Sequence, residues 1–147
     1  MADMHKNQPV PSPQPSGFVA AGVAHAQGTI FPSASRTAAA YTSDEMFNPN
    51  CKGVRLYTAN DAAGGSTATA KIQVRAPNSD VWIDLAGATT AALGSTTGSL
   101  LTVYPGLTGI ADAAGVTINQ HLGPAWRVVL TIGVDTGVSS VGADYLL

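Results

Sequence analysis

Residues 125–134 read AWRVVLTIGV, and this stretch decides the fold class of the chain. In an extended strand, every second side chain of the stretch lies on the same face. The large apolar side chains that would share one face are those of Trp126, Val128, Leu130, Ile132 and Val134. Alternation with a period of two residues is typical of a β-strand that buries one face. The stretch therefore predicts a strand with one face in a hydrophobic core.

Several other stretches show the same alternation, separated by turn sequences such as PNSD at 77–80 and DTG at 135–137. The predicted strands lie within RTAAAYTS, KGVRLYTAND, TATAKIQVRAP, VWIDL, SLLTVYPG and VSSVGADYLL. In VWIDL we expect Val81, Ile83 and Leu85 to face the core. The polar segment VTINQHLGP at 116–124 is expected to be a connection.

Seven or eight short strands at regular spacing, with no convincing helix, favour an all-β fold. We predict a single antiparallel β-sandwich over residues 29–147 that resembles a jelly roll. An extended N-terminal arm over residues 1–28 precedes it. The pattern fixes neither the order of the strands nor whether the sheets close into a barrel.

The arm reads MADMHKNQPVPSPQPSGFVAAGVAHAQG and allows three interpretations: an export signal, a disordered tail, or an arm bound to another molecule. Its four prolines and single early Lys6 argue against a signal peptide, although AHA at 24–26 resembles a cleavage site. Ordering such a segment costs about 1–2 kcal/mol per residue, which needs roughly a thousand Å² of apolar contact to offset. We therefore expect the arm to lie on a neighbouring subunit or on another protein. Its apolar anchors would be Val10, Phe18, Val19, Val23, Ile30 and Phe31.

The composition argues against several classes of partner. The chain of 147 residues carries 11% charged residues and a net charge of -2, and its seven basic residues are scattered. Nucleic acid and membrane surfaces are recognised by clustered positive charge, so we expect neither as a partner. The lone Cys51 excludes an intramolecular disulfide.

The sequence offers no convincing catalytic or metal-binding constellation. His5, His25 and His121 are the only histidines, and two of them lie in the arm. A nucleophile needs a base within hydrogen-bond reach, and a metal site needs closely spaced ligands. We therefore expect a protein that is not an enzyme and that has no cofactor.

One cluster allows a different interpretation. Asp80, Trp82 and Asp84 would share the outward face of VWIDL, which places an aromatic ring between two carboxylates. Such a face can bind a sugar, because the ring stacks on C–H groups while carboxylates accept hydroxyl protons. The alternative is that Trp82 simply covers a sheet edge or packs under the arm.

Taken in order, RTAAAYTSDE, GVRLYTAN, KIQVRAPNSDVWIDL, LLTVYPGL, AWRVVLTIGV and SVGADYLL resemble the small virion proteins of tailed bacteriophages, specifically head decoration (cement) proteins. This resemblance implies a protein on the outer surface of the virion that bridges subunits of the major capsid protein. If the arms exchange between copies of the chain, a dimer or a trimer would follow, and the sequence does not choose between the two. A tail or head-to-tail connector protein and a carbohydrate-binding β-sandwich on the virion surface are the alternatives.

Overall fold

The computed structural model describes residues 18–19, 27–48, 52–61, 65–94, 97–106 and 115–147. These residues form eleven β-strands and no helix, which confirms the predicted all-β class. Their alternating apolar pattern is that of strands with one buried face, and turns rich in Gly, Asn and Asp separate them.

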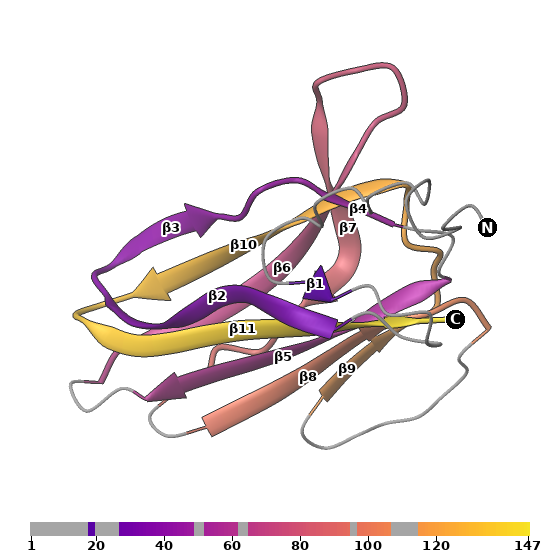
Figure 1. Ribbon diagram of the computed structural model, residues 1–147. Helices are drawn as coiled ribbons and strands as arrows, with labels where there is room; N and C mark the ends of the chain where they lie inside the picture. The colour runs from indigo at the N-terminus through magenta and orange to yellow at the C-terminus, as the bar shows by residue number, and fades with distance from the viewer. Residues whose placement is uncertain (1–17, 20–26, 49–51, 62–64, 95–96, 107–114) are drawn as a thin grey trace, which may run out of the picture.

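The strands form two sheets that pack face to face (Figure 1). Sheet A has the order β1 (Phe18–Val19), β2 (Gln27–Arg36), β11 (Gly137–Leu146), β5 (Gly53–Asp61), β8 (Thr97–Val103) and β9 (Gly115–Ile118). Sheet B has the order β3 (Ala39–Thr42), β10 (Ala125–Gly133), β6 (Thr67–Arg75) and β7 (Trp82–Thr89). The short strand β4 (Met46–Phe47) also pairs with β10.

The order of the strands is that of an eight-stranded jelly roll. Without β1, β4 and β9, the two sheets read β2-β11-β5-β8 and β3-β10-β6-β7. Successive strands of these eight cross from one sheet to the other, except at the β6–β7 hairpin. All the strand pairs are antiparallel except β8 with β9. The predicted antiparallel sandwich of the jelly-roll type is therefore confirmed, and its strand order is now known.

The core lies between the sheets and contains the predicted face of β10. Trp126, Val128, Leu130 and Ile132 are buried there. The indole N–H of Trp126 donates to the Tyr145 hydroxyl at 3.0 Å, and that hydroxyl donates to the carbonyl of Phe47 at 2.6 Å. Burying an indole without a partner for its N–H is costly, so these bonds let Trp126 occupy the core.

Val134 is the exception on the predicted β10 face, because its side chain is 70% exposed. The strand ends at Gly133, and Val134 begins the turn into β11 with a left-handed backbone (φ 40°). The alternation of apolar residues thus continues one step beyond the strand itself.

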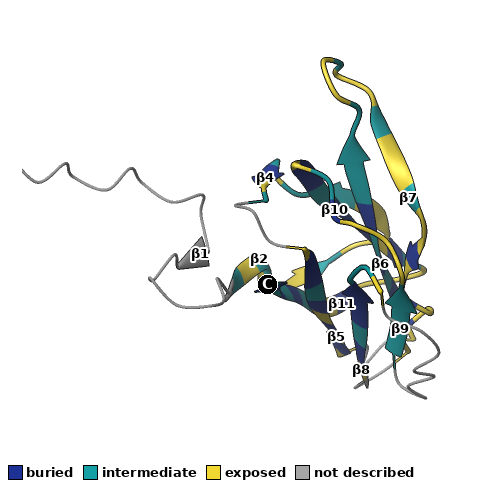
Figure 2. Ribbon diagram, turned by 90° about the vertical axis from the view of Figure 1, so that its right-hand side faces the viewer, coloured by how far each residue is buried: buried dark blue, intermediate teal, exposed yellow. Residues whose placement is uncertain are grey.

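Val81 and Ile83 were expected to face the core, but neither is buried, since their side chains are 58% and 51% exposed. Ile83 does lie on the inner side, because it pairs with the half-buried Val74 of β6. The tip of the β6–β7 hairpin, however, projects beyond the rest of the sandwich (Figure 2). The inner face of this hairpin therefore continues past the end of the core.

Two further expectations need correction. Residues 116–118 of the predicted connection belong to β9, where Val116 and Ile118 pack against the core and the strand pairs in parallel with β8. Ile30 and Phe31, expected as anchors on the arm, lie in β2 and pack against the core of their own domain. Large apolar side chains in a paired strand are buried most readily by the opposing sheet of the same domain.

Candidate functional site

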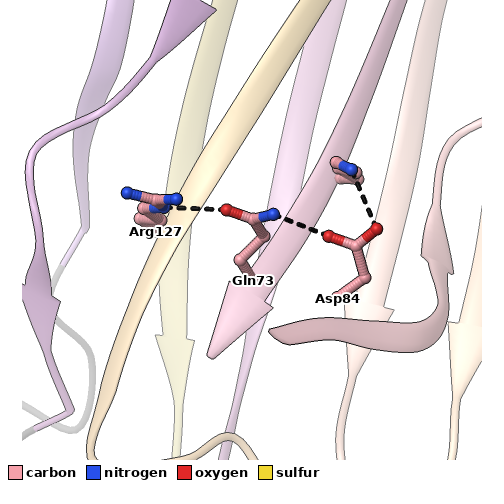
Figure 3. A network of polar contacts seen from close by, with 4 residues as sticks. Gln73, Asp84 and Arg127 are labelled. Carbon is pink, nitrogen blue, oxygen red and sulfur yellow. Dashed lines mark hydrogen bonds and ion pairs between the residues drawn. The ribbon is translucent and has the colours of Figure 1, made fainter. Parts of the chain in front are cut away.

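The outer face of sheet B carries a row of polar side chains that spans three strands. Arg127, Gln73 and Asp84 are opposite one another on β10, β6 and β7. Arg127 Nε donates to Gln73 Oε1 at 2.8 Å, and Gln73 Nε2 donates to Asp84 Oδ1 at 2.7 Å (Figure 3). Lys71 Nζ completes the row with an ion pair to Asp84 Oδ2 at 2.8 Å. We call these four residues the polar row.

Trp82 lies beside this row, and one residue of the row stacks on its ring. The Arg127 guanidinium lies over the indole ring, 4.2 Å from the ring centroid. This is a cation–π contact, which stabilises both side chains where they are partly shielded from water. Next to it, Arg75 forms an ion pair with Glu45 at 3.0 Å.

The polar row favours the ionised form of Asp84. The hydrogen bond from Lys71, followed by that from Gln73, lowers the pKa of the Asp84 carboxyl below its ordinary value. Both carboxylate oxygens accept bonds from neighbouring side chains, and one face of the Trp82 ring is covered by Arg127. Asp80 lies in the exposed turn of the hairpin, apart from this row. The groups proposed to bind a sugar are therefore largely engaged within the protein itself.

The outer face of sheet A has a different character, because it contains a groove of about 590 Å³ across β2, β11, β5 and β8. Small or neutral side chains line it, and none of the lining residues is charged. They include Tyr57, Ala59, Gly98, Leu100, Ser140 and Gly142. Tyr57, 42% exposed, and half-buried Leu100 are the bulky side chains among these six.

One polar contact lies at the rim of the groove. The Tyr57 hydroxyl donates to Asp144 Oδ2 at 2.7 Å, across the β5–β11 pair. The hydrogen bond to Asp144, followed by partial burial, raises the pKa of the Tyr57 phenol above its ordinary value. The phenol therefore stays neutral, and the groove remains an uncharged surface at physiological pH.

The predicted arm anchors fall into three groups. Val10 and Val23 lie outside the described residues. Phe18 and Val19 form β1, which pairs with Gly28 and Gln27 at the edge of sheet A. Ile30 and Phe31 belong to β2, as described above.

Candidate catalytic and metal-binding residues remain apart in the described portion of the chain. His121 is exposed in the connection between β9 and β10, whereas His5, His25 and Cys51 lie outside the described residues. No group of three His, Cys, Asp or Glu side chains gathers among the described residues. In the same residues there is no helix that could cross a membrane.

Sequence reasoning missed the groove, because its lining comes from four strands that are distant in sequence. The available signal was the small size of the outward residues, such as Ala59, Gly98, Ser140 and Gly142. Only the pairing of β11 with β5, and of β5 with β8, places these residues side by side.

No protein-family model and no curated protein sequence matches this chain. Among solved structures, it is similar to one described as the structure of infectious bursal disease virus Gx strain, with a TM-score of 0.46 and 11% sequence identity. The match covers 82% of this chain and 31% of that chain. This chain therefore spans less than a third of the protein that it matches.

Proposed function

We propose that this chain is a non-enzymatic structural protein of a virion, which decorates the outer surface of the capsid and bridges subunits of the major capsid protein. The N-terminal arm would act as a clamp on neighbouring molecules. This proposal rests on the resemblance of the ordered sequence segments to phage head decoration proteins. The observation that carries it is the jelly-roll strand order, an architecture found in viral capsid proteins.

The outer face of sheet A is the surface that we assign to the shell. Its groove is neutral, and exposed apolar side chains such as Tyr57 and Val138 lie on this sheet. Covering such a surface releases water from apolar area and leaves no charge unpaired. Many copies with modest contacts would together stabilise a symmetric shell.

Jelly rolls also occur in lectins, so glycan binding is the natural competing function. The geometry around Trp82 does not favour it, because Arg127 covers the indole and Asp84 binds Lys71 and Gln73. A tail or connector protein would instead form a ring in solution, which sedimentation of the isolated protein would detect.

The test is co-sedimentation of the purified chain with capsids of its virus that have been stripped of this component. We expect binding that saturates at a fixed number of copies per shell. Binding that never saturates, or no binding, would contradict the proposal. A variant that lacks residues 1–17 keeps every strand from β1 onward, and we expect it to bind more weakly while it stays folded.

A further inference from the structure

Among the described residues, no strand pairs with the outer edge of β3 in sheet B. β3 is the last strand of its sheet, and its regular antiparallel register with β10 runs from Ala39 to Thr42 without a bulge. Three of its four residues are exposed, and it carries neither charge nor proline. Natural proteins usually protect edge strands with charges, prolines or bulges, because an edge presents unpaired N–H and C=O groups.

The other sheet edges show such protection. β1 covers the start of β2, which also contains Pro32 and two shifts of register against β11. β7 is irregular after Asp84, and Gly87 there has a left-handed backbone (φ 75°). The edge at β9 is close to β7, because Ile118 lies against Gly87.

The β3 edge is also held in a fixed position. The Arg36 guanidinium lies over the rings of Phe31 and Tyr41, at 5.5 Å and 5.9 Å from their centroids, and donates to the carbonyl oxygens of Pro32, Ala34 and Ser139. The Tyr41 hydroxyl donates to the Thr37 carbonyl at 3.0 Å. These contacts fix the corner between β2 and β3, so an added strand would meet a pre-formed edge.

The sequence of the arm suits one-sided pairing. Pro9, Pro11, Pro13 and Pro15 occupy every second position. In an extended strand, alternate N–H groups point to opposite edges, so these prolines leave one edge without donors. Val10, Ser12, Gln14 and Ser16 keep their donors on the other edge. Such a segment can pair with one sheet edge and then stops further addition of strands.

The position of β1 favours a second molecule over its own domain. Only Gly17 separates residue 16 from β1, which pairs with Gln27 and Gly28 at the start of β2. β3 follows the other end of β2, whose ten residues span about 33 Å, so a segment joined to β1 through Gly17 starts far from the β3 of its own molecule. No Asp, Glu, Lys or Arg occurs between residues 7 and 26, which matches the uncharged β3 edge.

We propose that residues 9–16 of one molecule add as a strand to the β3 edge of a second copy of this chain. The added strand extends sheet B of the second molecule, and its prolines prevent a further strand from pairing there. On the shell, where the proposed function places copies side by side, it would link neighbouring molecules.

The test uses single-cysteine variants in a Cys51→Ser background. Gln14→Cys in one full-length protein and Ala40→Cys in another are mixed at high concentration and oxidised, and the disulfide-linked heterodimer is identified by mass spectrometry. Only pairing between molecules can form it. A Ser35→Cys variant on the β2 edge replaces the Ala40→Cys protein as the matched control.

We expect the heterodimer with Ala40→Cys to exceed the control by about ten-fold, which corresponds to about 1.4 kcal/mol of preferential contact. Equal yields at the two edges would overturn the proposal. A disulfide within a single molecule that carries both Gln14→Cys and Ala40→Cys, formed in place of the heterodimer, would also overturn it. That result would assign the arm to its own domain.

Two further substitutions in the Gln14→Cys protein test the role of the prolines. Ser12→Pro removes a donor from the pairing edge and should reduce the heterodimer yield about five-fold, as expected for one lost hydrogen bond. Pro13→Ala changes the opposite edge and should leave the yield within about two-fold. Equal effects would contradict one-sided pairing.

The two proposals can fail separately. A heterodimer without shell binding would contradict the proposed function alone. Shell binding without a heterodimer in concentrated solution would contradict only the pairing of residues 9–16 with β3.

Discussion

The outer faces of the two sheets differ in whether their side chains already bind partners within the protein. On sheet B, the polar row joins Lys71, Asp84, Gln73 and Arg127 in one chain of contacts, with Trp82 stacked beside it. On sheet A, small neutral side chains line an open groove. One face already has its partners within the molecule, whereas the other would gain from being covered.

This difference is the reason why we propose sheet A, and not sheet B, as the interaction surface. Charged groups that bind one another across a sheet rigidify it and offer little to a partner. A neutral groove carries no desolvation penalty for charge when another surface fills it. We therefore propose that sheet A binds the partner and that the polar row of sheet B contributes local stability.

The largest expected effect comes from placing a charge in the groove. Ala59→Arg introduces a long cation on an exposed position of β5, whereas Thr131→Arg introduces the same side chain on the exposed outer face of β10. We expect Ala59→Arg to weaken binding to stripped shells by about 30-fold or more, the range of an interface hot spot. Thr131→Arg should bind like the unmodified protein in the same sedimentation assay.

Both proteins should keep their stability within about 0.5 kcal/mol, because both positions are exposed. If Thr131→Arg weakened binding as much as Ala59→Arg, the two faces would not differ in function.

The next effect concerns stability. Arg127→Ala removes the hydrogen bond to Gln73 and the cation–π contact with Trp82. We expect it to lower the free energy of unfolding by about 1–2 kcal/mol. Urea denaturation followed by circular dichroism would measure this change. Shell binding should stay the same, and a loss of binding at full stability would reassign the sheet B face to a partner.

A smaller effect concerns the titration of Asp84. Its pKa is lowered in the folded protein, so its contribution to stability is present above the unfolded pKa and is lost as the pH falls through the folded pKa. Lys71→Met should move the Asp84 pKa upward, toward its ordinary value. Carboxyl chemical shifts followed by NMR from neutral to acidic pH would measure this. An unchanged pKa would show that Lys71 does not hold the carboxylate.

The smallest effect is expected at Tyr57. Tyr57→Phe removes the hydroxyl that donates to Asp144 but keeps the ring at the groove. Because the pair is exposed, we expect a change of less than about 0.5 kcal/mol in unfolding free energy. Binding should stay within about two-fold, and a larger loss would show that the hydroxyl itself contacts the shell.

The sequence predicted those features that depend on the alternation within one strand. In KGVRLYTAND, alternation puts Val54 and Leu56 on one face and Arg55 and Tyr57 on the other, and the structure buries Val54 and Leu56. Alternation also gave Ile83 its correct side of the sheet, but it could not show that the hairpin extends past the opposing sheet. Burial there depends on the relative lengths of elements that are distant in sequence.

The candidate site was less predictable for the same reason. Trp82 and Asp84 were correctly placed on the outward face, yet their partners Arg127 and Lys71 come from other strands. The parallel pairing of β9 likewise depends on β8 and not on its own four residues. Contacts between strands follow from topology, which a single sequence pattern does not contain.

The difference between the two faces can be tested with a density map of shells decorated with this protein, at a resolution that shows the orientation of the two sheets. We expect the groove of sheet A to be covered by the shell and the polar row of sheet B to face solvent. A map in which sheet B contacts the shell, with the groove open to solvent, would contradict it.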